Sequence, residues 1–292
     1  MQLINKLRGI YLKIYFYFNN KILFKDKFGL SYYLYKNTRP NSTFISGVRT
    51  DDTTVLYTIE KILSSSSLTN NNFINCIDVG GYIGIITLMM SNILEREQKK
   101  WKIHTFEPTA ESFLRLQENV NLNHFNSNVV LNNVAVSDRS GISTLKIHQD
   151  APSYNHLNIN SLENNQNNIT QKNIKVITLS DYMYKNNIKH LTICKVDTEM
   201  SDYLVIKGLY KYLEAKEIDF FIFEYQNSSY EKIKNIMAKN DYTIYYMVRN
   251  KNILVDSFEN YPKNCKSLLN LIAVSPEKKN KFLNIFKFNK DI

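Results

Sequence analysis

The chain has 292 residues, of which 43% are hydrophobic and 13% aromatic, and a formal net charge of +10. This size and composition are enough for a sizeable core, which excludes a disordered chain and fits one large α/β domain or two small ones. The three cysteines, Cys76, Cys194 and Cys265, are far apart, and two of them lie in apolar runs, so we expect buried thiols rather than disulfides or a metal cluster. Residues 10–18 are too short a run, with Lys13 in it, to predict a transmembrane span. These features predict a cytoplasmic protein.

The positive charge is concentrated at the two ends of the chain. Residues 1–39 hold eight Lys or Arg against one acid, a net charge of +7, and residues 262–292 hold seven Lys against two acids, a net charge of +5. We assign residues 1–48 to a basic aromatic extension, expected to be helical, and residues 276–292 to a basic tail. One interpretation of this extension is peripheral contact with the inner face of an anionic membrane. The alternative is a solvated helix that packs on the domain through its aromatic face. Charge at the ends rather than around a site argues against a nucleic-acid partner.

Apolar runs and segments of helical period alternate from residue 74 onward. The runs predict strands at 74–79, 103–107, 129–134, 192–197, 218–224, 242–248 and 268–274, and the segments between them predict helices at 83–95, 109–123, 202–214 and 228–239. This alternation is typical of parallel βαβ units in a doubly wound α/β sheet, which we place in a domain spanning residues 49–275. The Asn- and Ser-rich segment 149–173 has little periodicity, and we expect it to form a loop. Loops carried by a rigid scaffold often select the substrate, so we place this loop on the side of the site where the acceptor substrate would bind.

A glycine-rich turn follows the first strand of this domain, in the sequence "DVGGYIG". A dinucleotide-binding turn requires glycines at positions n, n+2 and n+5, and no register of this segment meets that requirement. The pattern present is an acid, Asp78, followed by Gly80 and Gly84. This form suits S-adenosylmethionine, which offers an ammonium group to a carboxylate and a carboxylate to backbone amides, and has no pyrophosphate to be held.

Glu107 ends the second strand, at the edge of the sheet where the glycine turn also lies. A carboxylate at this place can accept hydrogen bonds from both hydroxyls of a ribose. NAD enzymes place an acid at a similar distance, so this residue supports a nucleoside ligand without distinguishing the two cofactors. A surface acid that caps the following helix is the alternative.

Five blocks of the chain, taken together, resemble the FkbM family of S-adenosylmethionine-dependent methyltransferases. The blocks are "IDVGGYIGIITLMM", "TFEPTAESFLRLQENVNLN", "VVLNNVAVSDRSGISTL", "VITLSDYM" and "ICKVDTEMSDYLVIKG", in this order, between about residues 74 and 225. The resemblance implies the class I methyltransferase fold, a Rossmann-like, seven-stranded and mostly parallel sheet. It also implies O-methylation of a hydroxyl on a sugar, a polysaccharide or glycolipid precursor, or a secondary metabolite.

Carried over residue by residue, the resemblance implies a set of cofactor contacts. The set consists of Asp78, Gly80, Gly81, Gly84, Glu107, Ser137, Asp138 and Asp197. Ser137 and Asp138 would flank the adenine, although the segment "SDRSG" equally predicts a plain turn. Met200 stands where the family has a glycine, which departs from its pattern beside the acceptor pocket.

Three acids at strand ends are the candidate catalytic residues. Asp197 and Glu199 follow the fourth strand and Glu224 ends the fifth, so their carboxylates are expected to converge beside the transferring methyl group. Asp197 or Glu199 would act as the base or position the acceptor hydroxyl, and His156, at the border of the acceptor-side loop, is a further candidate base. Binding of a divalent ion by Asp197, Glu199 and Glu224 is a minor alternative, and we expect no metal.

Two other functions remain open at this point. A nucleic-acid methyltransferase would show an Asn- or Asp-Pro-Pro-aromatic element after the fourth strand, and "KVDTEM" contains neither proline nor an aromatic residue. A domain that keeps the fold but has lost catalysis would explain Met200, whereas the complete set of acids argues against it.

Overall fold

We describe a computed structural model of the whole chain. The structure describes residues 15–26, 28–36, 53–69, 73–148, 156–157, 169–198, 201–248, 251–257 and 270–286, with the backbone alone for 146–148, 156–157 and 169–170.

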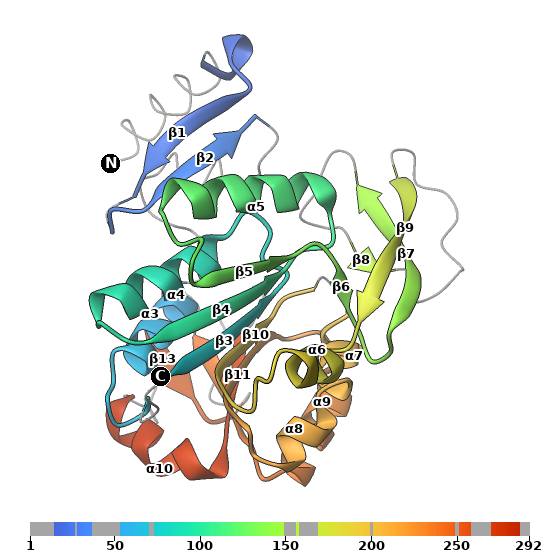
Figure 1. Cartoon of the computed structure of the whole chain (residues 1–292). Coiled ribbons are helices and arrows are strands. Elements are labelled where there is room, and N and C mark those ends of the chain that lie inside the picture. Colours follow the sequence, from blue (N-terminus) through green and yellow to red (C-terminus); the bar gives the residue numbers. More distant parts are fainter. Residues whose placement is uncertain are drawn as a thin grey trace.

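An eight-stranded sheet forms the centre of the molecule (Figure 1), in the order β13-β12-β14-β11-β10-β3-β4-β5. The strands are β3 (Ile74–Val79), β4 (Trp101–Phe106), β5 (Val129–Asn132), β10 (Leu191–Val196), β11 (Ile218–Glu224), β12 (Thr243–Val248), β13 (Ile253–Val255) and β14 (Asn270–Val274). Strands β5, β4, β3, β10 and β11 run parallel, and β14, β12 and β13 pair antiparallel. The predicted doubly wound, Rossmann-like α/β class is confirmed, with the short edge strand β13 added to the seven strands expected.

Helices cover both faces of this sheet. One face carries α3 (Thr53–Leu63), α4 (Ile85–Arg96), α5 (Ala110–Leu122) and α10 (Pro276–Ile285), and the other carries α6 (Leu179–Lys185), α7 (Asp202–Lys207), α8 (Tyr210–Glu214) and α9 (Tyr230–Lys239). Neighbouring residues of a strand serve opposite faces: Cys76 packs in the first core and Ile77 in the second. A strand buried on both sides reads as a continuous apolar run, which is why the sequence pattern located these strands.

A second sheet of four strands lies beside the carboxyl end of β5 (Figure 1), in the order β6-β9-β7-β8. Its strands are β6 (Ala135–Val136), β7 (Gly141–His148), β8 (His156–Leu157) and β9 (Ile169–Ile177). The expected loop 149–173 is therefore wrong in part, because its described residues 156–157 and 169–173 are strand. The pattern failed because residues 170–173 of β9 are polar, and the pairing of β9 with β7 depends on backbone hydrogen bonds, which leave no apolar pattern in the sequence.

The N-terminal extension forms a hairpin in its described part, where the sequence predicted a helix. Residues 15–18 are helical, and strands β1 (Lys21–Lys25) and β2 (Ser31–Tyr35) pair antiparallel. Tyr32 and Leu34 point inward and are buried, which is the alternation of a strand with one packed face.

The expected basic tail 276–292 is also corrected by the structure over its described residues. Residues 276–285 form helix α10, with Phe282 and Phe286 buried four residues apart on the side that faces the sheet. Lys278 is buried as well, donating to the Leu68 carbonyl at 2.7 Å and pairing with Asp219 at 3.3 Å. The high lysine content concealed this amphipathic helix.

Candidate functional site

The glycine turn between β3 and α4 is packed against two neighbouring strands. Gly80 has a φ of 82°, and a Cβ atom on it would lie 1.8 Å from the backbone oxygen of Asp197, after β10. Gly84 has a φ of 94°, and its Cβ would lie 2.8 Å from a methyl carbon of Leu116 in α5. A Cβ on Gly81 would lie 2.3 Å from the Thr105 side chain. At Gly80 the contact with backbone excludes any side chain, and at Gly84 the positive φ favours glycine in addition to the contact with a leucine methyl.

The backbone amides of this turn are used within the protein. The amides of Gly80 and Gly81 donate to the Phe106 carbonyl at 2.9 and 3.0 Å, and the Gly84 amide donates to Gly81 at 2.7 Å. The Tyr82 amide donates to the Glu107 carboxylate at 2.9 Å. These bonds set the shape of the turn and bring the end of β4 against it.

Glu107 is buried beside the turn and accepts a backbone hydrogen bond on each carboxylate oxygen. One oxygen accepts from the Tyr82 amide and the other from the Thr109 amide, both at 2.9 Å. Burial raises the pKa of Glu107 to about 7, although these hydrogen bonds oppose the rise. Each carboxylate oxygen has a second lone pair, so both can still accept a hydrogen bond from a neighbouring diol.

Asp78 lies fully buried beneath the turn. One of its oxygens accepts from the Thr87 hydroxyl at 2.7 Å, in the first turn of α4, and the other lies 3.7 Å from the Lys195 ammonium. Burial raises the pKa of Asp78, while Lys195 and Thr87 act in the opposite direction. Both oxygens therefore face protein groups.

Lys195 links two of the predicted acids and was not singled out from the sequence. It is a buried lysine in β10, paired in register with Asp78 in β3, and its ammonium lies 3.2 Å from the Asp197 carboxylate. Burial alone would lower the pKa of Lys195, but Asp197 and Asp78 outweigh this effect and raise it. The site thus contains a buried cation between two acids. A lysine inside the apolar strand "LTICKV" is the sequence signal that would have found it.

Asp197 is accessible, with 45% of its side chain exposed. It follows Val196, which pairs in register with Phe223, so Asp197 and Glu224 end neighbouring parallel strands. Asp202, buried nearby, accepts hydrogen bonds from the amide of Thr198 at 2.9 Å and of Glu224 at 3.3 Å, and so ties the two strand ends together. Burial, with Asp197 nearby, raises the pKa of Asp202 to about 6.

The segment predicted to flank an adenine lies against α7. The Asp138 carboxylate pairs with the Lys207 ammonium at 2.7 Å, and this hydrogen bond lowers its pKa. Ser137 is buried, and its hydroxyl lies 3.4 Å from the Asp138 carboxylate. A Cβ on Gly208 would lie 2.7 Å from the Ser137 carbonyl oxygen, so this segment is held closely by the end of α7.

Some predicted residues lie outside what the structure describes. Glu199 and Met200 are among them, and His156 is described only as backbone in β8. In the described part of the chain, no group of three or more His, Cys, Asp or Glu is placed to hold a metal ion.

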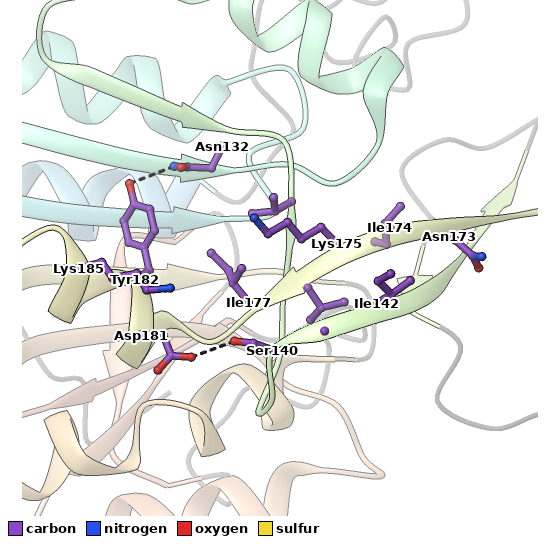
Figure 2. Close-up of a pocket in the computed structure, with 13 residues that line it drawn as sticks. Asn132, Ser140, Ile142, Asn173, Ile174, Lys175, Ile177, Asp181, Tyr182 and Lys185 are labelled. Carbon is purple, nitrogen blue, oxygen red and sulfur yellow. Dashed lines mark hydrogen bonds between the residues drawn. The ribbon is translucent and has the colours of Figure 1, made fainter.

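A cleft of about 760 Å³ opens elsewhere, between the small sheet and α6 (Figure 2). Ile142, Ile174 and Ile177 line it, and the Asn132 amide donates to the Tyr182 hydroxyl at 3.3 Å in its wall. None of the residues predicted for cofactor or catalysis lines this cleft. It is a separate feature from the strand-end site.

A known protein family matches the part of the chain that contains this site. The sequence model "Methyltransferase FkbM domain" matches residues 78–244, more than half of the chain, from the buried acid under the glycine turn into β12. The chain belongs to the FkbM methyltransferase family. No curated protein sequence is significantly similar to it.

Solved methyltransferase structures resemble this FkbM chain at low sequence identity. The methyltransferase FkbM from Methylobacillus flagellatus KT is 14% identical with a TM-score of 0.43, over 69% of this chain and 44% of that one, so less than half of that protein's length is matched. The N-terminal domain of human METTL16 in complex with SAH is 12% identical with a TM-score of 0.38, over 76% and 68%. Precorrin-6y C5,15-methyltransferase from Geobacter metallireducens GS-15 is 9% identical with a TM-score of 0.39, over 75% and 84%.

Proposed function

We propose that this FkbM chain is an O-methyltransferase that binds S-adenosylmethionine at the glycine turn and methylates a hydroxyl of a sugar, a polysaccharide or glycolipid precursor, or a secondary metabolite. The observation that carries the proposal is that one short turn contacts both the residue proposed to bind the cofactor and the residue proposed to act on the acceptor. Its Tyr82 amide holds Glu107, and its Gly80 lies against the backbone of Asp197. A diol-accepting carboxylate and an accessible carboxylate are thereby fixed at the same edge of the sheet.

The residues present fit this cofactor at Glu107. Burial raises the pKa of Glu107, although the amides of Tyr82 and Thr109 and the Thr109 side chain donate hydrogen bonds to its carboxylate. The two hydroxyls of a ribose would supply donors to both oxygens. When bound, S-adenosylmethionine supplies an electrophilic methyl group on a sulfonium sulfur.

Asp197 is the residue best placed to act on the acceptor. An alcohol oxygen that takes up a methyl group must lose its proton, and an accessible carboxylate can accept that proton or orient the hydroxyl. Lys195 holds Asp197 by an ion pair and a hydrogen bond at 3.2 Å, which limits the directions in which the carboxylate can point. Most of the rate enhancement in a displacement of this kind comes from alignment of the reacting atoms. Glu224, at the end of β11, would form the neighbouring wall of the acceptor site.

Calorimetric titration of the purified chain with S-adenosylmethionine, and with NAD as a control ligand, tests the cofactor. We expect binding of the first and not of the second. Ribose hydroxyls favour the ionised form of Glu107, so the association constant should rise with pH up to about 7 and level off above it. With a pKa near 7, the increase between pH 6 and pH 8 is about tenfold.

Glu107→Gln should weaken binding and remove this pH dependence, and Glu231→Gln, at an exposed position on α9, should change neither. Wild-type binding that is absent, or that is unaffected by Glu107→Gln, would contradict the cofactor assignment.

Asp197→Asn tests the catalytic half. Loss of a proton acceptor typically lowers the rate by 10²–10⁴-fold, and we expect kcat to fall by about this amount. Methyl transfer from labelled cofactor to a panel of sugars and hydroxylated metabolites would be compared for wild type, Asp197→Asn and Glu224→Gln. An Asp197→Asn variant that methylates as fast as the wild type would exclude Asp197 from this role.

A further inference from the structure

Exposed apolar side chains gather on the N-terminal hairpin and on the helical turn that precedes it. Among the described residues, Tyr17 is 78% exposed, Phe18 77% and Leu23 56%, and Phe28 is exposed as well. These are four of the ten large hydrophobic side chains that are exposed in the described part of the chain. Scattered single exposures are ordinary on a protein surface, but a group within twelve consecutive residues indicates an interaction surface.

The hairpin is anchored by its other face. Ile22 and Phe24 pack inward against the core, so Lys21, Leu23 and Lys25 point outward together. In Figure 1 the hairpin lies over α5, outside the layers around the central sheet. The outward side chains therefore stand away from the core rather than covering it.

The edge of β2 that does not pair with β1 is hydrogen-bonded to side chains of α5 and of its C-terminal cap. The Ser31 amide donates to the Asn123 side chain at 2.9 Å, and the Tyr33 amide donates to the Asn119 side chain at 2.7 Å. Asn119 in turn donates to the Ile83 carbonyl at 2.9 Å, within the glycine turn region. These hydrogen bonds hold the hairpin against α5. The same amides are therefore not available to pair with an additional strand.

Two lysines of β1 lie beside the exposed Leu23, and the described charges around them are of both signs. Lys25 and Lys21 flank Leu23 on the outer face, with Lys21 also paired to Glu118 at 3.3 Å. Asp26 uses its carboxylate on the backbone amides of Phe28 and Leu30 in the hairpin turn. Residues 1–39 as a whole carry a net charge of +7.

We propose that the exposed side chains of the helical turn, Tyr17 and Phe18, and of the outer face of β1, Lys21, Leu23 and Lys25, rest on an anionic phospholipid surface. Aromatic side chains are favoured at the boundary between headgroups and acyl chains, and lysines are attracted by anionic lipid. A second copy of the chain fits less well, because a two-fold contact through this face would bring its lysines together. Within the described residues, the structure contains no helix with the length and hydropathy of a transmembrane span.

Co-sedimentation of the full chain with vesicles tests the proposal. Wild type should bind vesicles that contain phosphatidylserine, bind poorly to phosphatidylcholine alone, and lose binding as salt is raised. Lys25→Gln should lower the affinity about fivefold, the effect of one lysine near such a surface. Its matched control is Lys185→Gln, a change of the same kind at an exposed lysine of α6.

A second pair of variants tests the contribution of the exposed aromatic side chains to vesicle binding. Tyr17→Ser should weaken vesicle binding severalfold, whereas Tyr184→Ser, at an 83% exposed tyrosine of α6, should not. Affinity for S-adenosylmethionine should be the same in all four variants. The proposal would be overturned if each hairpin-region variant bound vesicles as well as its control variant, or if the wild type did not bind vesicles at all. Concentration-dependent association without lipid that Tyr17→Ser abolishes would also overturn it, because the face would then bind another copy of the chain.

Discussion

Replacing Gly80 by alanine should destabilise the fold by about 4 kcal/mol or more and abolish cofactor binding. The added Cβ would stand 1.8 Å from the Asp197 carbonyl oxygen, and that oxygen belongs to backbone that cannot turn aside as a side chain can. Relief of this contact would separate the ends of β3 and β10. It would also disturb the amides of Gly80 and Gly81, which donate to the Phe106 carbonyl. Urea unfolding and calorimetric titration would measure the two effects.

Gly29→Ala is the matched control for this experiment. Gly29 also has a positive φ, of 85°, but no atom lies within 4 Å of a Cβ placed on it. The conformational strain alone should cost about 1–2 kcal/mol, with cofactor binding intact. A Gly80→Ala variant that unfolds at the same urea concentration as Gly29→Ala would show that the contact with Asp197 is unimportant.

Lys195→Met should lower kcat by about 10²-fold and destabilise the protein by about 3–5 kcal/mol. The change removes the buried cation that faces both Asp78 and Asp197, leaving Asp78 without a charged partner and Asp197 without the group that orients it. Lys195→Arg keeps the charge and should recover part of the activity. Methyl-transfer rates and urea unfolding would be measured for both variants.

Lys278→Met separates the catalytic effect from the structural one. Lys278 is also a buried lysine with one carboxylate partner, Asp219, and it lies in α10, far along the chain from the glycine turn. Its removal should destabilise the protein to a similar extent and leave kcat of the folded enzyme unchanged. If Lys195→Met and Lys278→Met lose activity equally at a temperature where both are folded, the positioning role of Lys195 is wrong.

Local signals carried most of the site prediction. The strand-turn-helix around Gly80 and Gly84 and the acid after β4 are recognised from short stretches, since each depends on residues that are neighbours in sequence. The surroundings of the acid before this turn are not a local property. Asp78, predicted to face the cofactor, is fully buried between Thr87 and Lys195. Its burial depends on α4 and β10, which no local pattern reports.

The sequence by itself determined the alternation of strands and helices, the glycine turn and the acids at the strand ends. These follow from the two-residue period of strands, the helical period and the conformational freedom of glycine, which are all local properties. Only the tertiary structure decided that β10 lies beside β3, and hence that Lys195 stands opposite Asp78. It also decided that the N-terminal segment is a hairpin and residues 276–285 a packed helix. These outcomes depend on which surfaces meet, because a pairing between distant segments is set by the burial of the whole core rather than by the residues on either side.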